Sequence, residues 1–212
     1  MTPEEFRTVG YKIIDWIADY RANVGDYPVM STVEAGAIRA GLPPAPPQTA
    51  EPFEAILADL DQIILPGITH WNHPRYFAYF PSNASLASVL GDLLSSGIGM
   101  IGLNWQSGPA LTELEEVTTD WMRQMLGLSE AWSGVIQDTA STSTLVALMC
   151  AREWATDHGQ SRGGLQSEQK PLVVYTSTQS HSSVQKAALL AGFGLENLRV
   201  IDTDAEHALR VD

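Results

Sequence analysis

The chain has 212 residues, of which 44% are hydrophobic, so it is long and apolar enough to bury a sizeable core. Its formal net charge of −13 argues against a nucleic-acid partner, because the phosphate backbone attracts basic surfaces. The single cysteine, Cys150, excludes an internal disulfide framework and suits a reducing compartment, and we expect it to be a small buried helical residue.

The N-terminal sequence shows no signal for export. Residues 1–8 (MTPEEFRT) lack the basic and apolar regions of a signal peptide. No apolar run reaches the ~18 residues of a membrane span, and Asp92 interrupts the most apolar candidate. We therefore expect a cytoplasmic protein without a membrane partner.

Two amphipathic helices are predicted at the start of the chain. Thr2, Pro3 and Glu5 form a typical helix start with a capping box. One face of this helix is apolar, and it comprises Phe6, Val9, Ile13, Ile17 and Tyr20. An extended proline-rich connector over 42–47 precedes a second helix, which residues 66–67 should end. Because both apolar faces need a partner, we expect an arm exchanged between the subunits of a homodimer.

The remainder indicates an α/β fold. Helices are predicted over 85–96 and from Pro109 to Gly127. Three strands are predicted next, over 135–137, 172–175 and 198–201. They alternate with helices over 144–157 and 182–191, a loop over 159–169, and a helix from Ala205. This alternation is typical of a mainly parallel sheet. Three strands are too few for a stable doubly wound domain, so we expect further strands from elsewhere.

Two strand-to-helix junctions carry many hydroxyl groups. Residues 138–143 and 177–183 should lie at the carboxyl ends of neighbouring strands, where ligands bind in parallel sheets. Helix N-termini and hydroxyl donors together suit a phosphate, although the hydroxyls could equally cap the helices. The glycine motifs of nucleotide-binding loops and the serine hydrolase elbow do not occur.

Three histidines and an aromatic stretch are further candidates. His181 lies at the second junction, where an imidazole could stack on a cofactor ring, move a proton or simply cap the helix. His70 and His73 could suggest a metal pair, but no third ligand has matching spacing, so we expect no metal site. Residues 76–82 (YFAYFPS) could form an apolar pocket wall or ordinary core packing.

Several motifs occur together in one order and spacing. They are His70-Trp71, Tyr79-Phe80-Pro81-Ser82, Trp105, Pro109, Thr112-Glu113-Leu114-Glu115, Thr139-Ala140-Ser141 and Gln179-Ser180-His181-Ser182-Ser183-Val184. This set resembles the pyridoxal-phosphate-dependent group II decarboxylases, and in particular the aromatic-L-amino-acid decarboxylases, over essentially the whole chain.

The resemblance implies a fold and an activity. Residues 1–84 would form a helical dimerisation arm with the substrate wall, and residues 85–212 would begin the large domain of an aspartate-aminotransferase-like, fold type I enzyme. The cofactor would be pyridoxal 5′-phosphate, and the reaction would convert an L-amino acid, aromatic by this resemblance, to its amine and CO2. A non-catalytic dimerisation fragment and a related aromatic aldehyde synthase remain the alternatives.

The resemblance also assigns roles to single residues. Ala140 and Ser141 match the pair that binds the cofactor phosphate, and His181 matches the histidine that stacks on the pyridine ring and contacts the substrate. Ile101 and Leu103 match residues that enter the pocket of the partner subunit. The substrate wall would comprise Trp71, Tyr79, Phe80, Pro81 and Ser82.

The chain departs from the family pattern at three points. Its lysines, Lys12, Lys170 and Lys186, do not stand in the Asn-x-His-Lys context of the Schiff-base lysine. We therefore expect this chain to be an N-terminal portion, with that lysine and the acid on the pyridine nitrogen in a later region or on a complementary chain. Asp138 stands where the family usually has glycine, and Leu103 stands where the aromatic-specific enzymes often have phenylalanine.

Overall fold

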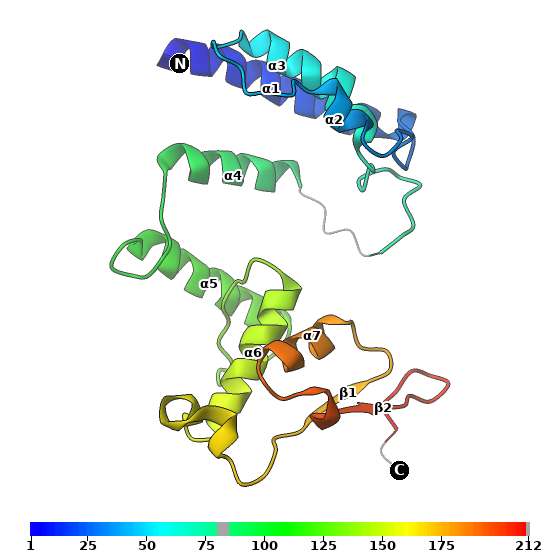
Figure 1. Ribbon diagram of the computed structural model, residues 1–212. Helices are drawn as coiled ribbons and strands as arrows, with labels where there is room; N and C mark the ends of the chain where they lie inside the picture. The colour runs from blue at the N-terminus through cyan, green and yellow to red at the C-terminus, as the bar shows by residue number, and fades with distance from the viewer. Residues whose placement is uncertain (80–84, 211–212) are drawn as a thin grey trace. The chain divides into compact units, whose positions relative to one another are not determined.

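The computed structural model describes residues 1–79 and 85–210, which form two units, Met1–Gly99 and Met100–Asp212 (Figure 1). From the resemblance we predicted a functional boundary after residue 84. The boundary between the two units, after Gly99, is defined by backbone contacts and does not test that prediction.

The first helix, α1 (Pro3–Asn23), begins as its sequence predicts. The Thr2 hydroxyl accepts a hydrogen bond from the Glu5 N–H at 3.2 Å, and the Glu5 carboxylate accepts one from the Thr2 N–H at 2.7 Å. This reciprocal pair satisfies two backbone donors that a helix start leaves without partners. A 3₁₀ turn (Val24–Asp26) ends the element.

A second helical segment lies beside α1 (Figure 1). It follows a short helix, α2 (Ala37–Gly41), and the connector over 42–47, which is neither helix nor strand, as predicted. The segment consists of α3 (Phe53–Asp59), a π-helical turn (Leu60–Ile64) and a 3₁₀ turn (Leu65–Gly67). Two polar contacts at 2.7 Å join it to α1, Lys12 Nζ with the Glu54 carboxylate and Trp16 Nε1 with Asp61.

The helix α4 (Leu86–Ile98) completes the first unit. Ser85 caps it by accepting the Ser88 N–H at 3.0 Å. Gly99 ends it at φ +69°, a conformation that favours glycine. The helix predicted over 85–96 is therefore confirmed and extends two residues further.

Over residues 100–210, the second unit contains a small parallel sheet and three α-helices (Figure 1). The strands β1 (Val174–Ser177) and β2 (Leu198–Ile201) pair with Val174 opposite Leu198. The helices are α5 (Pro109–Met125), α6 (Ala140–Ala155) and α7 (Ser183–Leu190). α6 and α7 pack against each other, and the Arg152 guanidinium donates to the Ala191 carbonyl at 2.6 Å.

Two predictions for this unit are wrong. Residues 135–137 form no strand, because the Ile136 N–H donates to the Glu115 carboxylate at 2.6 Å instead of to a neighbouring strand. Residues after Ala205 turn back into an antiparallel bridge between Thr203 and Leu209, not a helix. The predicted loop over 159–169 contains two 3₁₀ turns, Gly159–Arg162 and Gly164–Ser167.

Few apolar side chains are buried in the described residues. The buried apolar set is Val24, Leu65, Ala187, Ala188, Ala191 and Phe193. Trp154, by contrast, is 86% exposed on α6, and Cys150 is exposed one turn earlier, which contradicts the expected burial of that cysteine. The face of α6 that carries them lacks a covering layer in the described part of the chain. Among residues 1–79 and 85–210, no helix is both long and apolar enough to cross a membrane.

Candidate functional site

The hydroxyl-rich segment 139–144 is the start of α6 rather than a loop ahead of it. Thr139 is the N-cap, and its side-chain oxygen accepts the Thr142 N–H at 3.2 Å. Ala140 and Ser141 occupy the first two helical positions, so their N–H groups have no acceptor within the helix. These two donors and the positive end of a 16-residue helix make a suitable anion site.

The hydroxyl groups of this segment divide into two kinds. Those of Thr139 and Thr142 lie 3.1 Å apart, while Ser143 donates to the Thr139 carbonyl and Thr144 to the Ala140 carbonyl. Capping and helix-internal bonds therefore account for four hydroxyls. The hydroxyl of Ser141 is exposed and has no hydrogen-bond partner among the residues that the structure describes. Ser141 is thus the hydroxyl left for a ligand.

The backbone ahead of this turn is held by α5. The Glu115 carboxylate accepts the Ile136 N–H, and a side chain at Gly134 would lie 3.0 Å from Cβ of Thr119. Asp138 is exposed and directly precedes the N-cap. A carboxylate there is favourable toward the helix start but repels a bound phosphate.

His181 lies between β1 and α7, as predicted. Its Nδ1 accepts the Ser183 N–H at 3.2 Å, so a neutral ring carries its hydrogen on Nε2. The turn before it is fixed by Ser180, whose N–H donates to the Ser177 carbonyl and whose hydroxyl accepts the Ser177 N–H. The imidazole is exposed, which suits a ring that stacks on a ligand.

The aromatic residues of the first unit form a small stack. The Trp71 ring lies 5.2 Å from Tyr76 and 5.7 Å from Tyr79 between centroids, and the Tyr79 ring is almost parallel to it. Trp71 is 45% exposed and Tyr79 is 80% exposed, at a φ of +57°. The predicted wall residues Phe80, Pro81 and Ser82 lie outside the described residues.

The loop that carries Ile101 and Leu103 is folded back on itself. The Gly108 N–H donates to the Asn104 carbonyl at 2.9 Å, and a side chain at Gly108 would lie 2.4 Å from the Ile101 carbonyl oxygen. Trp105 Nε1 donates to the Glu113 carboxylate at 2.8 Å and ties the loop to α5. Ile101 and Leu103 remain exposed, Leu103 by 80%.

His70 and His73 are buried and stabilise a turn. His73 Nδ1 accepts the Arg75 N–H at 2.9 Å, and its Nε2 lies 3.1 Å from the Gly25 carbonyl. His70 Nδ1 lies 2.9 Å from the Tyr20 hydroxyl. The described residues contain no group of three or more side chains placed to hold a metal ion. Burial, and next the neighbouring His73, lower the pKa of His70.

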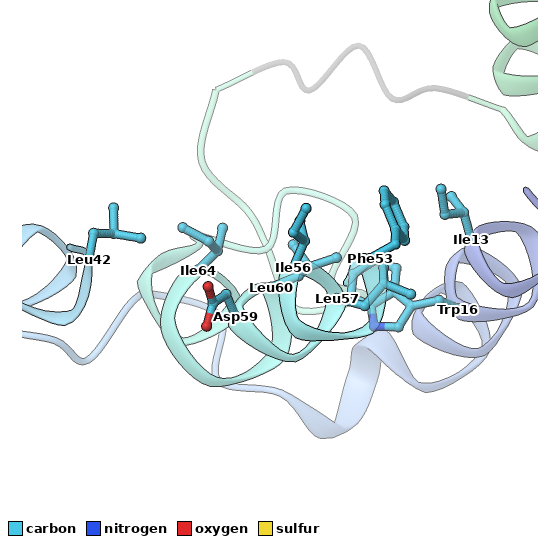
Figure 2. A pocket seen from close by; sticks show the side chains of 9 residues that line it. All are labelled: Ile13, Trp16, Leu42, Phe53, Ile56, Leu57, Asp59, Leu60 and Ile64. Carbon is cyan, nitrogen blue, oxygen red and sulfur yellow. The ribbon is translucent and has the colours of Figure 1, made fainter. Parts of the chain in front are cut away.

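A groove of about 430 Å³ lies along α1 and α3 (Figure 2). Its lining is almost entirely apolar, and it comprises Ile13, Trp16, Leu42, Phe53, Ile56, Leu57, Asp59, Leu60 and Ile64. The two predicted amphipathic helices thus bury only part of their apolar faces against each other.

The structure brings some predicted site residues into one unit and not others. Ala140, Ser141, His181 and the loop with Ile101 and Leu103 all belong to the second unit. The described wall residues, Trp71 and Tyr79, belong to the first. The predicted phosphate-binding turn at the start of α6 and the predicted ring-stacking histidine thus belong to one unit, and the aromatic stack belongs to the other.

The three lysines stand on elements other than the start of α6. Lys12 pairs with Glu54 on the arm, Lys170 is exposed in a polar segment, and Lys186 is exposed on α7. The residues present thus fit a phosphate group and a stacked ring, but not a covalent bond to an aldehyde.

Similarity to known proteins agrees with this arrangement. Residues 36–212 match the pyridoxal-dependent decarboxylase conserved domain. The chain belongs to the pyridoxal-dependent decarboxylase family. It is 43% identical over 213 residues to tyrosine decarboxylase of Papaver somniferum, covering 96% of this chain and 41% of that protein. It is 41% identical over 218 residues to phenylacetaldehyde synthase of Arabidopsis thaliana, covering 99% and 44%.

The fold is that of the N-terminal part of a fold type I decarboxylase. The structure matches Oryza sativa TDC, solved with PLP and tryptamine, with a TM-score of 0.89, 37% identity, and coverage of 97% of this chain and 43% of that one. The chain thus spans about two-fifths of the length of these relatives. The few buried apolar residues and the two-stranded sheet of the described residues agree with a portion of a larger fold.

Sequence reasoning missed the residues that support the site. Glu115 holds the segment before the phosphate turn, Glu113 holds the loop with Leu103, and Tyr20 contacts His70. The Thr-Glu-Leu-Glu motif was visible as part of the resemblance. The structural role of Glu115 in this motif follows only from the fold, because its carboxylate accepts a hydrogen bond from Ile136, 21 residues further along the chain.

Proposed function

We propose that this chain supplies the phosphate-binding turn, the ring-stacking histidine and part of the substrate wall of a pyridoxal-phosphate-dependent decarboxylase of aromatic L-amino acids. The observation that carries the proposal is the start of α6. Two backbone donors without a helical acceptor and the unused Ser141 hydroxyl meet there at the positive end of a helix. Because the chain belongs to the pyridoxal-dependent decarboxylase family, we infer that the anion bound here is the phosphate of pyridoxal 5′-phosphate.

In this proposal the residues of the chain bind and orient. The N–H groups of Ala140 and Ser141, with the Ser141 hydroxyl, hold the phosphate of pyridoxal 5′-phosphate. His181, fixed through Nδ1, presents its ring face to the pyridine and its Nε2–H to the substrate. When bound, the cofactor supplies an electron sink for the pair left by the departing carboxylate.

The substrate preference follows from the aromatic side chains. Trp71 and Tyr79, already stacked, offer flat apolar faces to an aromatic ring. In the proposed homodimer, Phe80, Pro81 and Ser82 continue this wall, while Ile101 and Leu103 reach the pocket of the partner subunit. Leu103 stands where related aromatic-specific enzymes often have phenylalanine, so the choice among aromatic substrates is left to the assay below.

The arm supports the proposed homodimer. The groove along α1 and α3 is apolar and accessible, and an equivalent helix of a second subunit would remove it from water (Figure 2). The amino acid is thus the small-molecule partner and a second copy is the protein partner. The lysine that holds the cofactor's aldehyde comes from a region that this chain does not contain or from a complementary chain.

The test is product analysis on this chain joined or mixed with the region that completes the relatives' length. L-Tyrosine, L-DOPA and L-tryptophan are supplied with pyridoxal 5′-phosphate, and CO2 and amine are measured. We expect CO2 and amine in equal amounts from at least one substrate. Cofactor uptake without CO2 release from any aromatic amino acid would contradict the proposal.

One observation favours a second candidate, which is an aldehyde synthase. The Arabidopsis thaliana relative of that name is almost as similar to this chain as the decarboxylase. The same assay separates the two activities, because the synthase consumes O2 and yields the aldehyde in place of the amine. A dimer that never takes up the cofactor would instead indicate a non-catalytic dimerisation fragment.

A further inference from the structure

The most completely buried polar groups of the first unit lie outside the proposed phosphate and ring contacts. His70 is 2% exposed and His73 is 3% exposed, although the chain as a whole leaves most large apolar residues accessible. Burying an imidazole costs free energy unless it is hydrogen-bonded. The contacts of these two histidines therefore indicate what their burial achieves.

Both histidines tie one turn to the end of α1. His73 donates from Nε2 to the Gly25 carbonyl, because its Nδ1 already accepts the Arg75 N–H. The His70 N–H donates to the Val29 carbonyl at 2.9 Å. A backbone bond from the His73 N–H to the His70 carbonyl then closes the turn that contains Trp71. The turn is thus attached to the segment after α1 at two points.

The side chain of His70 makes a third attachment, to α1 itself. Its Nδ1 lies 2.9 Å from the Tyr20 hydroxyl, and its ring is stacked on Tyr27 with centroids 5.0 Å apart. The Tyr20 ring is in turn stacked on Trp16 at 5.5 Å. Burial lowers the pKa of His70 and raises the pKa of Tyr20, so at neutral pH the contact is a hydrogen bond between neutral groups.

The aromatic contacts of Trp71 among the described residues are local. Trp71 is 45% exposed, and the two rings against it, Tyr76 and Tyr79, belong to the same segment. Tyr79 is more exposed still. The position of the indole therefore depends on the backbone of the turn, and the turn depends on its attachment to α1.

We propose that Tyr20 is a positioning residue that acts through its hydrogen bond to His70 and holds Trp71 in place in the substrate wall. The inference rests on the proposed function, because the wall belongs to the same pocket. Tyr20 itself touches neither substrate nor cofactor. Without its hydroxyl, a buried imidazole nitrogen loses its partner, and the turn gains alternative positions.

The first experiment needs no activity. The protein that contains this chain and the region completing the relatives' length is labelled with 5-fluorotryptophan, and the ¹⁹F resonance of Trp71 is assigned by its loss in Trp71→Phe. We expect Tyr20→Phe to shift or broaden this resonance, while Tyr11→Phe, a change at an exposed tyrosine of the same helix, leaves it in place. The ring of Tyr20 is kept, so its stacking on Trp16 is preserved. An unchanged Trp71 resonance in Tyr20→Phe overturns the proposal.

The second experiment uses the active protein. A typical net hydrogen bond corresponds to a factor of about 2–10 in an equilibrium constant. We expect Tyr20→Phe to raise KM for the aromatic substrate by about that factor, with kcat within about twofold of wild type. In a Trp71→Ala background, Tyr20→Phe should add no further change to KM.

An additive effect in that background, or a fall in kcat with KM unchanged, contradicts a role through Trp71. Failure of the proposed function gives a different result, because no variant then turns over any aromatic amino acid. In that case the ¹⁹F shift alone decides whether Tyr20 positions the indole.

Discussion

Asp138 and Ser141 lie on opposite sides of the N-cap of α6 and affect a bound phosphate in opposite ways. Ser141 offers the one hydroxyl of the turn that no contact within the described chain uses. Asp138 brings a negative charge to the same helix start. The site thus combines several hydrogen-bond donors with a carboxylate that repels a bound phosphate. Glycine at position 138 would remove this repulsion.

We predict that Asp138→Gly and Asp138→Asn both tighten binding of pyridoxal 5′-phosphate by about 2- to 5-fold, because an exposed charge pair contributes up to about 1 kcal/mol. Equilibrium dialysis measures the effect, which should shrink at high salt. Glu196→Gln removes one charge elsewhere in the same unit and is the control. Weaker binding in Asp138→Asn would mean that the carboxylate accepts a donor instead.

His70 predicts a pH dependence of stability. Its pKa lies below the ordinary 6.5 in the folded chain, so the unfolded chain binds the proton first as the pH falls. The contribution of neutral His70 is present above pH 6.5 and is lost below it, with a slope of at most about 1.4 kcal/mol per pH unit.

Urea unfolding at pH 7.5 and 5.5 measures this slope. The first unit should unfold at lower urea at pH 5.5, and His70→Asn should flatten the difference. His158→Asn, at an exposed histidine, should retain it. If stability changes equally with pH in the wild type and in His70→Asn, His70 is not the cause of the pH dependence.

At this scale the family resemblance predicted Ala140 and Ser141 as phosphate ligands, but the residue pattern alone did not show which hydroxyl of the segment is available. Ser141 and Ser143 look alike in the sequence. They differ only in the structure, where the Ser143 hydroxyl donates to the Thr139 carbonyl and the Ser141 hydroxyl has no partner among the described residues. The same holds for His70, whose side-chain hydrogen-bond partner is Tyr20, fifty residues away in the chain.

The elements on which the site depends follow their local sequence except where a distant group intervenes. α1 and α4 begin at capping residues and α5 begins at Pro109, while α4 and α5 end at Gly99 and Gly127, all of them signals that the sequence displays. The helix α6 begins four residues before its predicted start, because the hydroxyls were counted as loop residues while Ser143 and Thr144 bond helical carbonyls. Residues 135–137 form no strand, because a carboxylate takes the Ile136 N–H.

Glu115 should therefore control the approach to the phosphate turn. We predict that Glu115→Gln accelerates hydrogen exchange of the Ile136 amide and weakens cofactor binding several-fold, because the charged acceptor is lost. Glu116→Gln, the adjacent position on α5, is the control. Unchanged exchange at Ile136 would show that the carboxylate does not hold this segment.

The molecule as a whole exposes more apolar surface than an independent domain tolerates. The groove along α1 and α3 is one such surface, and the face of α6 with Trp154 is another. The sequence predicted the apolar stripes of the arm directly.

We predict that the arm dimerises the chain. Ile56→Glu, in the middle of the groove, should shift the chain toward monomer in sedimentation velocity, because a charge would be buried at the interface (Figure 2). Trp154→Glu, on α6, is the matched change outside the arm and should leave the dimer intact. A dimer that survives Ile56→Glu and dissociates with Trp154→Glu would place the contact on α6.

The central claim is that the start of α6 holds the phosphate of the cofactor. Its most direct test is calorimetric titration of pyridoxal 5′-phosphate into Ser141→Ala and Ser143→Ala of the protein that contains this chain and the region completing the relatives' length. The account predicts about 10- to 100-fold weaker binding for Ser141→Ala, since a bond to a charged group is lost, and less than about threefold for Ser143→Ala. Equal affinities in the two variants would contradict it.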